Sequence, residues 1–257
     1  MTAAVRVLQR NMLVYRRTFR GSIFSSFVTP LLFLTAMGVG LGSFITEQGR
    51  DVIGGYPYVH FLGPGLMAAT CMQSAVFEST FPIMGKIMWR RNYEAMLATP
   101  LRVRHIVGGE LAWIGFRMVL ISTVFLGVLW LFAIPRSPLA VVAIPAAVLT
   151  GVAFSAAIIS FAATQRNDAG FAWIFRFVIN PLFLFSGTFF PLTQLPVQFQ
   201  WVALATPLYH GVSLTRGLIL NDATLLAGWY WHAGYLIVFA AAFALVAHRL
   251  LHRRLVK

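Results

Sequence analysis

Four ionisable side chains interrupt the long apolar runs of this 257-residue chain, and they are the first candidates for chemistry. Glu78 lies about two turns before the end of one run. Glu110 lies about one turn into the next run and Arg117 about three turns into it. Arg176 lies less than two turns into a later run. Ionisable groups at membrane depth are rare, and they pair with one another or serve transport. The depths predict that Glu78 or Glu110 pairs with Arg117 or Arg176. Such a pair either fixes helix register or relays protons or substrate.

The apolar runs that carry these residues are long enough to cross a membrane, which takes about 20 apolar residues per helix. The chain is 59% hydrophobic and only 11% charged, so no sizeable soluble domain remains outside the runs. We therefore predict an all-α integral membrane protein with six transmembrane helices in a single domain over residues 1–257. The predicted spans are 23–46, 56–84, 106–134, 139–164, 170–189 and 227–248.

The cationic residues fall mainly on alternate gaps between the runs. Only Arg50, Arg136 and Arg216 fall on the opposite set of gaps. This bias is typical of a multi-pass inner (plasma) membrane protein with both termini in the cytoplasm. The net charge of +13 is scattered over helix ends, which favours contact with anionic lipid and not with nucleic acid. The residues assigned to the cytoplasmic side are Arg6, Arg10, Arg16, Arg17, Arg20, Lys86, Arg90, Arg91, Arg102, Arg104, Arg166, Arg249, Arg253, Arg254 and Lys257.

Residues 1–22 differ in kind from the first apolar run. Apolar residues recur there at alternating spacings of three and four, and arginines occupy other positions. The pattern predicts an amphipathic helix in the cytoplasmic interface, with a disordered basic tail as the alternative. The stripe consists of Val5, Leu8, Met12, Tyr15 and Phe19.

The gap at 190–226 is too apolar for a free loop and too broken to span twice. Pro191, Pro196 and Pro207 divide it into short pieces that carry aromatic residues such as Trp201. Irregular backbone is tolerated at membrane depth where it is buried against protein. We predict a re-entrant extracellular hairpin between the fifth and sixth spans.

The gap at 85–105 is the longest on the cytoplasmic side. Its middle, Arg90 to Ala98, has helical composition, and Thr99-Pro100 ends it because proline disfavours helix in the preceding residue.

Enzyme motifs are absent from the sequence. It contains no HExxH, no Gly-x-Ser-x-Gly elbow and no Walker A motif, and Cys71 is its single cysteine. We therefore expect no catalytic residue, metal or cofactor on this chain. If the protein moves a substrate uphill, the energy comes from ion coupling or from a separate ATPase.

The ordered motifs resemble those of ABC transporter permeases of the type-2 exporter family, in the branch of nodulation lipo-oligosaccharide and daunorubicin-type drug exporters. They cover almost the whole chain, in family order. The motifs are Tyr58-x-x-Phe61-Leu62-x-Pro64-Gly65, Phe77-Glu78, Glu94-x-x-Leu97-x-Thr99-Pro100-Leu101, Ser186-Gly187-x-x-Phe190-Pro191, Pro207-Leu208-x-His210 and Arg216-Gly217.

The resemblance implies that the cytoplasmic 85–105 loop carries a coupling helix for a nucleotide-binding ATPase subunit. Tyr93, Met96 and Leu97 are the expected apolar anchors, which is helix-in-groove recognition. The alternative is a surface helix that touches only lipid. The predicted coupling residues are Arg90, Arg91, Tyr93, Glu94, Met96, Leu97 and Pro100.

The same resemblance implies a permease homodimer in membrane lipid, with ATP and Mg²⁺ on the partner subunit. The expected substrate is a drug, a glycolipid or a lipo-oligosaccharide. An ion-coupled transporter acting alone is the alternative, and it needs titratable groups along the whole path. A membrane-embedded transferase needs a polar catalytic cluster that the sequence lacks.

Overall fold

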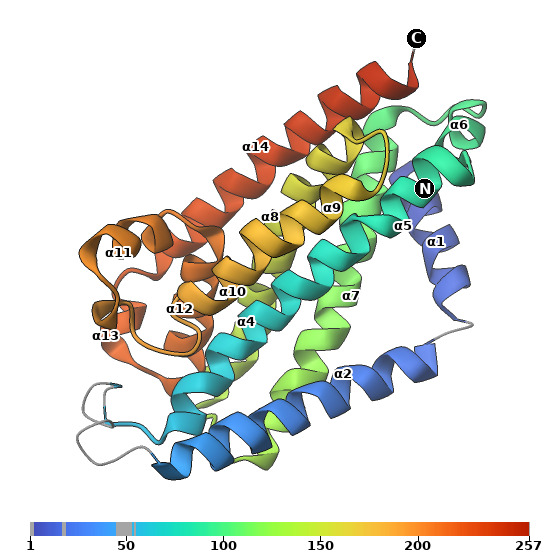
Figure 1. Ribbon diagram of the computed structural model, residues 1–257. Coiled ribbons are helices and arrows are strands. Elements are labelled where there is room, and N and C mark those ends of the chain that lie inside the picture. The colour runs from blue at the N-terminus through green and yellow to red at the C-terminus, as the bar shows by residue number, and fades with distance from the viewer. Residues whose placement is uncertain (1–2, 17–18, 45–52, 54, 257) are drawn as a thin grey trace.

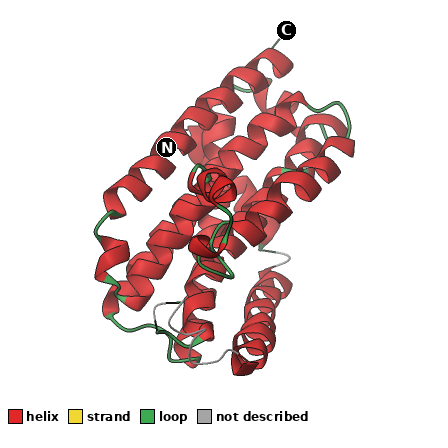
Figure 2. Cartoon of the chain, turned by 60° about the vertical axis from the view of Figure 1, so that its left-hand side comes forward, coloured by secondary structure: helices red, strands yellow, loops and turns green. Residues whose placement is uncertain are grey.

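The computed structural model describes residues 3–16, 19–44, 53 and 55–256, and these residues fold into helices joined by turns (Figures 1 and 2). Most of the predicted loop at 47–55 lies outside the described residues, as do Arg17 and Lys257. The elements are α1 (Ala3–Tyr15), α2 (Phe19–Phe33), η1 (Leu34–Gly40), η2 (Leu41–Phe44), α4 (Tyr58–Ser79), α5 (Phe81–Met84), η3 (Gly85–Trp89), α6 (Asn92–Leu97), α7 (Val103–Leu131), η4 (Pro138–Val142), α8 (Ala143–Thr164), α9 (Ala169–Ile174), η5 (Phe175–Ile179), α10 (Asn180–Phe185), η6 (Leu192–Gln194), α11 (Val197–Leu204), α12 (Pro207–Leu220), α13 (Ala223–Leu226) and α14 (Trp229–Leu255).

Three continuous helical segments among the described residues are long and apolar enough to cross a membrane. They are Val103–Leu131, Pro138–Thr164 and Trp229–Leu255. They match three of the predicted spans, although the last helix runs beyond the predicted end at residue 248. Its final turns carry His252, Arg253 and Arg254, and cations there stabilise the C-terminal end of the helix dipole.

The predicted span 56–84 is divided in the structure. Helix α4 ends at Ser79, Thr80 adopts a non-helical conformation, and Pro82 lies in the first turn of α5. Proline has no N–H and its ring clashes with the carbonyl four residues earlier, so it breaks the helix here. The chain then continues as helix through η3 to Trp89, past the predicted end. The Ser79 hydroxyl donates to the Ser155 hydroxyl at 2.8 Å and holds the end of α4 against α8.

The regions predicted as the first and fifth spans consist of shorter pieces. Residues 19–44 pass from α-helix to π-helix and 3₁₀-helix, and residues 169–185 contain the π-helical turn η5. Their uninterrupted apolar stretches are Ser26–Gly38 and Ala169–Phe185.

Helix α8 is at the centre of the bundle, where it packs against α4, α7, α12 and α14. Its buried positions are largely alanine, glycine and serine, which let neighbouring helix backbones approach closely. Helix α12 is buried along most of its length against α4 and α8. The predicted outer segment 190–226 therefore contains a helix of the core as well as exposed pieces.

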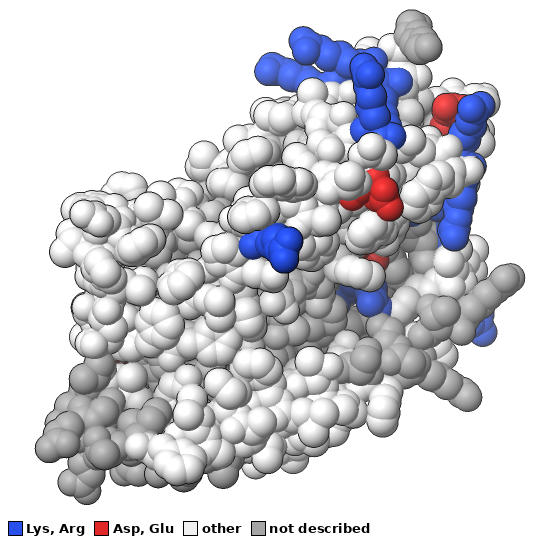
Figure 3. All heavy atoms as spheres, viewed as in Figure 1, with Lys and Arg blue, Asp and Glu red and all other residues white. Residues whose placement is uncertain are grey.

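The bundle has two chemically different ends (Figure 1). Helix α6 and the C-terminus of α14 lie at one end, and α11 and α13 lie at the other, beside the start of α14. We call them the α6 end and the α11 end. Figure 3 shows most of the visible lysine and arginine side chains toward the α6 end.

Candidate functional site: a polar groove at the α6 end

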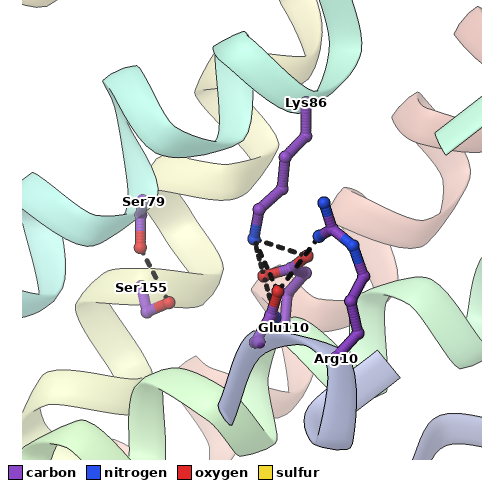
Figure 4. Close-up of polar contacts among 6 residues, drawn as sticks. Arg10, Ser79, Lys86, Glu110 and Ser155 are labelled. Carbon is purple, nitrogen blue, oxygen red and sulfur yellow. Dashed lines mark hydrogen bonds and ion pairs between the residues drawn. The ribbon is translucent and has the colours of Figure 1, made fainter. Parts of the chain in front are cut away.

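A buried ion pair joins η3 to α7 near the α6 end (Figure 4). The Lys86 ammonium lies 2.6 Å from Oε2 of Glu110 and 2.8 Å from Oε1. The Glu110 side chain is 2% exposed and that of Lys86 is 15% exposed. Of the pairings that the sequence left open, Glu110 forms neither the one with Arg117 nor the one with Arg176 among the described residues, because the helix continues to Trp89 and places Lys86 over this carboxylate.

Helix α1 adds a third element to this pair. The Asn11 amide donates to Oε2 of Glu110 at 3.1 Å, and its carbonyl oxygen accepts from Lys86 at 3.4 Å and from Arg10 at 3.2 Å. Asn11 is buried, so it satisfies lone pairs that would otherwise face an apolar interior.

The sequence analysis missed Asn11 because this polar residue lies outside the apolar stripe that was predicted to face the membrane interface. Val7 and Asn11 are buried and Tyr15 is half-buried, whereas Met12 of the predicted stripe is 40% exposed. The signal was present: residues 7, 11 and 15 repeat at a spacing of four and therefore share one helix face.

A glycine explains how α1 approaches α7 so closely. A Cβ atom on Gly109 would lie 2.5 Å from Cβ of Val7 and 3.0 Å from the carbonyl oxygen of Ala4. Such small-residue contacts are a common way to pack membrane helices. Residues 3–15 therefore form a helix docked on α7, so in this part of the chain the alternative of a disordered tail is wrong.

Tyr93 links α6 to the same carboxylate. Its side chain is 1% exposed, and burial, followed by the charge and hydrogen bond of Glu110, raises the pKa of its phenol well above the ordinary value. The left-handed conformation of Arg91, with φ of 46°, turns the chain from η3 into α6 and directs Tyr93 inward. This corrects the expectation that Tyr93 is exposed to a partner.

The other predicted coupling residues lie at the surface or close to it. Met96 and Leu97 are half-buried, and the remaining members are exposed. The exposed ones are Arg90, Arg91, Glu94 and Pro100.

The second carboxylate forms the predicted pair. Oε1 of Glu78 lies 3.1 Å from Nη2 of Arg117, and the two side chains are 23% and 12% exposed. The Arg117 guanidinium also lies over the Tyr15 ring at 4.4 Å, and Tyr15 meets the edge of Trp113 with ring centroids 5.5 Å apart. Helix α1 is thus bound to α7 at two levels, first at Glu110 and then at Arg117.

These groups line a groove of about 610 Å³ between α1, the α4–η3 segment and α7. Glu78, Lys86 and Arg117 lie in its walls together with the aromatic rings of Trp89 and Trp113. A largely apolar groove of about 750 Å³ lies on the other side of Tyr15, lined by residues such as Met12, Leu13 and Phe116. Tyr15 lines both, so a charged groove adjoins an apolar one.

Arg176 stands apart from this site. It is exposed on η5 beside exposed Trp173 and Phe177, and it makes neither of the ion pairs found among the described residues. Of the pairings that the sequence left open, those with Arg176 are therefore not formed among the described residues.

The predicted hairpin residues lie at the α11 end. Pro196 and Trp201 are exposed, Pro191 is half-buried, and buried Pro207 begins α12. No group of three or more potential metal ligands occurs among the residues that the structure describes.

Comparisons with known proteins identify the family of the chain. The sequence model of the ABC-2 type transporter family matches residues 2–220. Nodulation protein J of Rhizobium leguminosarum bv. viciae is 32% identical over 98% of this chain and 94% of its own length. Nodulation protein J of Rhizobium meliloti is 30% identical over 98% and 93%. The inner membrane transport permease YadH of Escherichia coli is 26% identical over 88% and 87%.

Proposed function

Because the chain belongs to the ABC-2 type transporter family, we propose that it is the permease of an ATP-driven exporter for an amphipathic or lipid-linked substrate. It is a transport subunit, and hydrolysis of ATP takes place on a separate subunit. The substrate class includes drugs, glycolipids and lipo-oligosaccharides. ATP and Mg²⁺ bind the partner ATPase, and this chain binds no cofactor.

The proposal of an amphipathic substrate rests on the two adjoining grooves. The polar groove offers ammonium, guanidinium and carboxylate groups, and the groove beyond Tyr15 is mainly apolar. A molecule with a polar head and an apolar tail matches both, because each part then leaves water for a surface of its own kind. This juxtaposition is the single observation that favours an amphipathic cargo.

The contacts of α6 support its role as the coupling helix. Through Tyr93, α6 touches Glu110, and Glu110 also binds Lys86 and Asn11. A push on α6 therefore reaches α7 and α1, which line the grooves. In this mechanism, closure of the ATPase dimer shifts the bundle between two arrangements.

The proposed topology has six spans and cytoplasmic termini. The spans are α2–η2, α4–η3, α7, η4–α8, α9–α10 and α14, and α11–α12 is the re-entrant extracellular hairpin. Support comes from the basic side chains toward the α6 end and from the exposed apolar residues of α11, such as Val197, Trp201 and Val202. Trp and apolar side chains favour the membrane interface, and cationic loops favour the cytoplasm.

Arg176 supports a permease homodimer. Arg176 is exposed on η5, and Trp173, Phe177 and Leu184 of the same α9–α10 segment are exposed as well. A charged side chain within a membrane helix faces a bundle interior or a water-filled cavity and avoids lipid. A second copy packed on this face provides that environment.

The coupling helix supplies the test. Substitution of Met96 and Leu97 by Ala removes the half-buried apolar contacts of α6, and a few such anchors dominate binding energy in an interface. We expect loss of ATPase co-purification and of substrate-stimulated hydrolysis, with permease insertion retained and the melting temperature lowered only slightly, because both side chains also pack against the core. The matched control is Arg102→Ala, which removes an exposed cation and whose smaller effect shrinks at high salt.

A normal complex with coupled hydrolysis in the Met96/Leu97 double variant would contradict the assigned docking site. Transport by the purified permease alone, driven by a proton gradient, would instead favour the ion-coupled alternative. That alternative gains no support from the described carboxylate pairs, because Glu78 and Glu110 both lie in the half of the bundle near α6.

A further inference from the structure

A pocket with both polar and apolar lining residues lies at the α11 end, away from the groove at the α6 end. Its volume is about 310 Å³, and it is enclosed by the start of α4, the turn after α10, α12 and the turn before α13. Side chains able to hydrogen-bond or to stack line it, namely Tyr56, Thr193, Tyr209, Ser213, Arg216 and Asp222. We call it the Arg216 pocket.

Arg216 is held in place by main-chain oxygens. Its Nε donates to the carbonyl of Phe61 at 3.2 Å, and its Nη2 donates to the carbonyls of Gly187 at 2.9 Å and Thr188 at 3.4 Å. The guanidinium also lies 3.8 Å from the centroid of the Phe61 ring. These contacts fix the orientation of the guanidinium plane, because two of its nitrogens donate hydrogen bonds to main-chain carbonyl oxygens.

Among the residues that the structure describes, none accepts a hydrogen bond from the third nitrogen of this guanidinium. A guanidinium has five N–H groups, and the contacts above engage only those on Nε and Nη2. Neither ion pair found among the described residues involves Arg216. A fixed, charged donor therefore contributes to a pocket wall without a carboxylate bound to it.

Asp222 provides the opposite kind of group in the same pocket. Its Oδ1 accepts from the Thr224 hydroxyl at 2.6 Å and from the Thr224 N–H at 2.9 Å. These bonds, with the Thr224 hydroxyl first, hold the pKa of the carboxyl below its ordinary value, so the group is ionised at neutral pH. The turn thus presents an oriented acceptor.

The combination of groups selects a class of ligand. A phosphate would meet Arg216 favourably but would be repelled by Asp222, and an acyl chain would offer no hydrogen-bonding group to either side chain. A neutral ring with several hydroxyls offers acceptors to the arginine, donors to the aspartate and a C–H face to the aromatic rings of Tyr56 and Tyr209. The volume is near the lower limit of small-molecule pockets, which suits a ring-sized group.

We propose that the Arg216 pocket binds a sugar ring, with Arg216 donating to ring or acyl oxygens and Asp222 accepting from hydroxyls. The sugar belongs either to the exported glycolipid as it emerges or to a soluble saccharide on the outer side. The assignment of the pocket to the outer side rests on the proposed function and its topology.

Binding to the full-length permease in lipid nanodiscs tests the proposal directly. The probes are soluble trimers of glucose and of N-acetylglucosamine, with inorganic phosphate as a third ligand, and the readout is saturation-transfer NMR with titration. We expect saturable binding of a sugar trimer. Asp222→Asn should weaken it about tenfold, or about 1.4 kcal/mol, since the variant replaces a hydrogen bond to a charged group by one to a neutral group.

The variants are chosen to keep the fold. Asparagine still accepts from the Thr224 N–H and caps helices well, so Asp222→Asn should preserve the turn. Thr193→Trp fills the pocket from an exposed turn and should abolish sugar binding. Asp168→Asn removes an exposed carboxylate outside the pocket lining and should leave binding unchanged.

Saturable phosphate binding that displaces the sugar would overturn the proposal, and so would the absence of saturable sugar binding. Equal affinity in Asp222→Asn and wild type would overturn it as well.

In transport assays, slower glycolipid export by Asp222→Asn assigns the site to the cargo. Unchanged export with lost trimer binding assigns it to a soluble saccharide. Co-purification and hydrolysis by the ATPase complex are measured on the same preparation. Normal values together with absent sugar binding reject only the pocket, whereas an absent ATPase rejects the proposed function.

Discussion

The two ends of the bundle stabilise buried charge by different means. At the α6 end, carboxylates meet cations, as in Glu110 with Lys86 and Glu78 with Arg117. At the α11 end, Arg216 is bound by carbonyl oxygens of the main chain. The first arrangement joins side chains from several helices, so motion of one helix affects all of them. The second depends on the local shape of the backbone and leaves donors for a ligand.

The difference matters for how each end can move. Separating η3 from α7 at the α6 end leaves a buried charge without its partner, which is strongly unfavourable, and separating α1 removes the hydrogen bond from Asn11 to Glu110. The Arg216 contacts depend on the turn at Gly187, whose φ of 79° suits glycine. We therefore expect the α6 end to behave as one mechanical unit and the α11 end to respond to changes in backbone conformation. The following predictions test this contrast.

Removal of the buried carboxylate should have the largest effect. Glu110→Ala leaves Lys86 without its partner and should lower the free energy of unfolding by about 3 kcal/mol. Glu110→Gln should cost less because it retains hydrogen-bonding atoms. Thermal unfolding in detergent measures both, and Glu94→Ala, at an exposed position on α6, is the control. Equal shifts for Glu94→Ala and Glu110→Ala would show that the α6 end is not held by this pair.

A methyl group beside Arg216 should disturb the α11 end. A Cβ at Gly65 would lie 2.8 Å from Nη2 of Arg216 and 3.2 Å from the Thr188 carbonyl oxygen, so Gly65→Ala should cost about 1–3 kcal/mol by overpacking. Gly127→Ala is the matched control, since nothing lies within 4 Å of its Cβ. Helix propensity favours that control by about 0.5–1 kcal/mol. If both substitutions stabilise the protein in denaturant titrations, the Arg216 contacts are not rigid.

The partly exposed pair should matter less than the buried one. Water reaches Glu78, which is 23% exposed, more than Glu110, which is 2% exposed, so Glu78→Ala should cost about 1–2 kcal/mol, below the cost of Glu110→Ala. Melting temperature and transport are measured on the same protein. Lost transport with an unchanged melting temperature would favour the relay interpretation of Glu78.

Acid should reveal the smallest effect, at the α11 end. Because hydrogen bonds from Thr224 lower the pKa of Asp222 in the folded state, its stabilisation is present above the ordinary value of 3.8. It is lost as the pH falls through the lower folded-state pKa, where the carboxyl becomes protonated. Asp222→Asn should remove about 0.5 kcal/mol of this acid dependence. Unfolding titrations below about pH 4 measure it, and an unchanged pH profile would mean that the turn does not hold this carboxylate.

Composition and the order of motifs were sufficient to assign the protein class and family. Continuous apolar runs predicted the three longest membrane-length segments, and the family motifs in order predicted the ABC-2 assignment. The Glu78–Arg117 pair also followed from sequence, because both residues lie at similar depths in apolar runs. These features are local or additive along the chain.

The packing of the cytoplasmic segment 85–105 was not predictable in the same way. Whether Tyr93 faces a partner or its own bundle depends on the left-handed turn at Arg91, and one residue of rotation changes which face of a short helix is buried. The break at Thr80 and Pro82 likewise separates α4 from the helical segment α5–η3. The position of that segment determines which cation pairs with Glu110.

The sequence alone thus determined an apolar, basic, all-helical membrane protein of the ABC-2 type, because hydrophobic length and charge distribution are properties of the chain itself. Only the tertiary structure decided that Lys86 and Asn11 bind Glu110 and that Arg216 is held by backbone carbonyls. Every residue carries a carbonyl oxygen, so such an acceptor leaves no mark in the sequence. Long-range partners are selected by the packing of all the helices together.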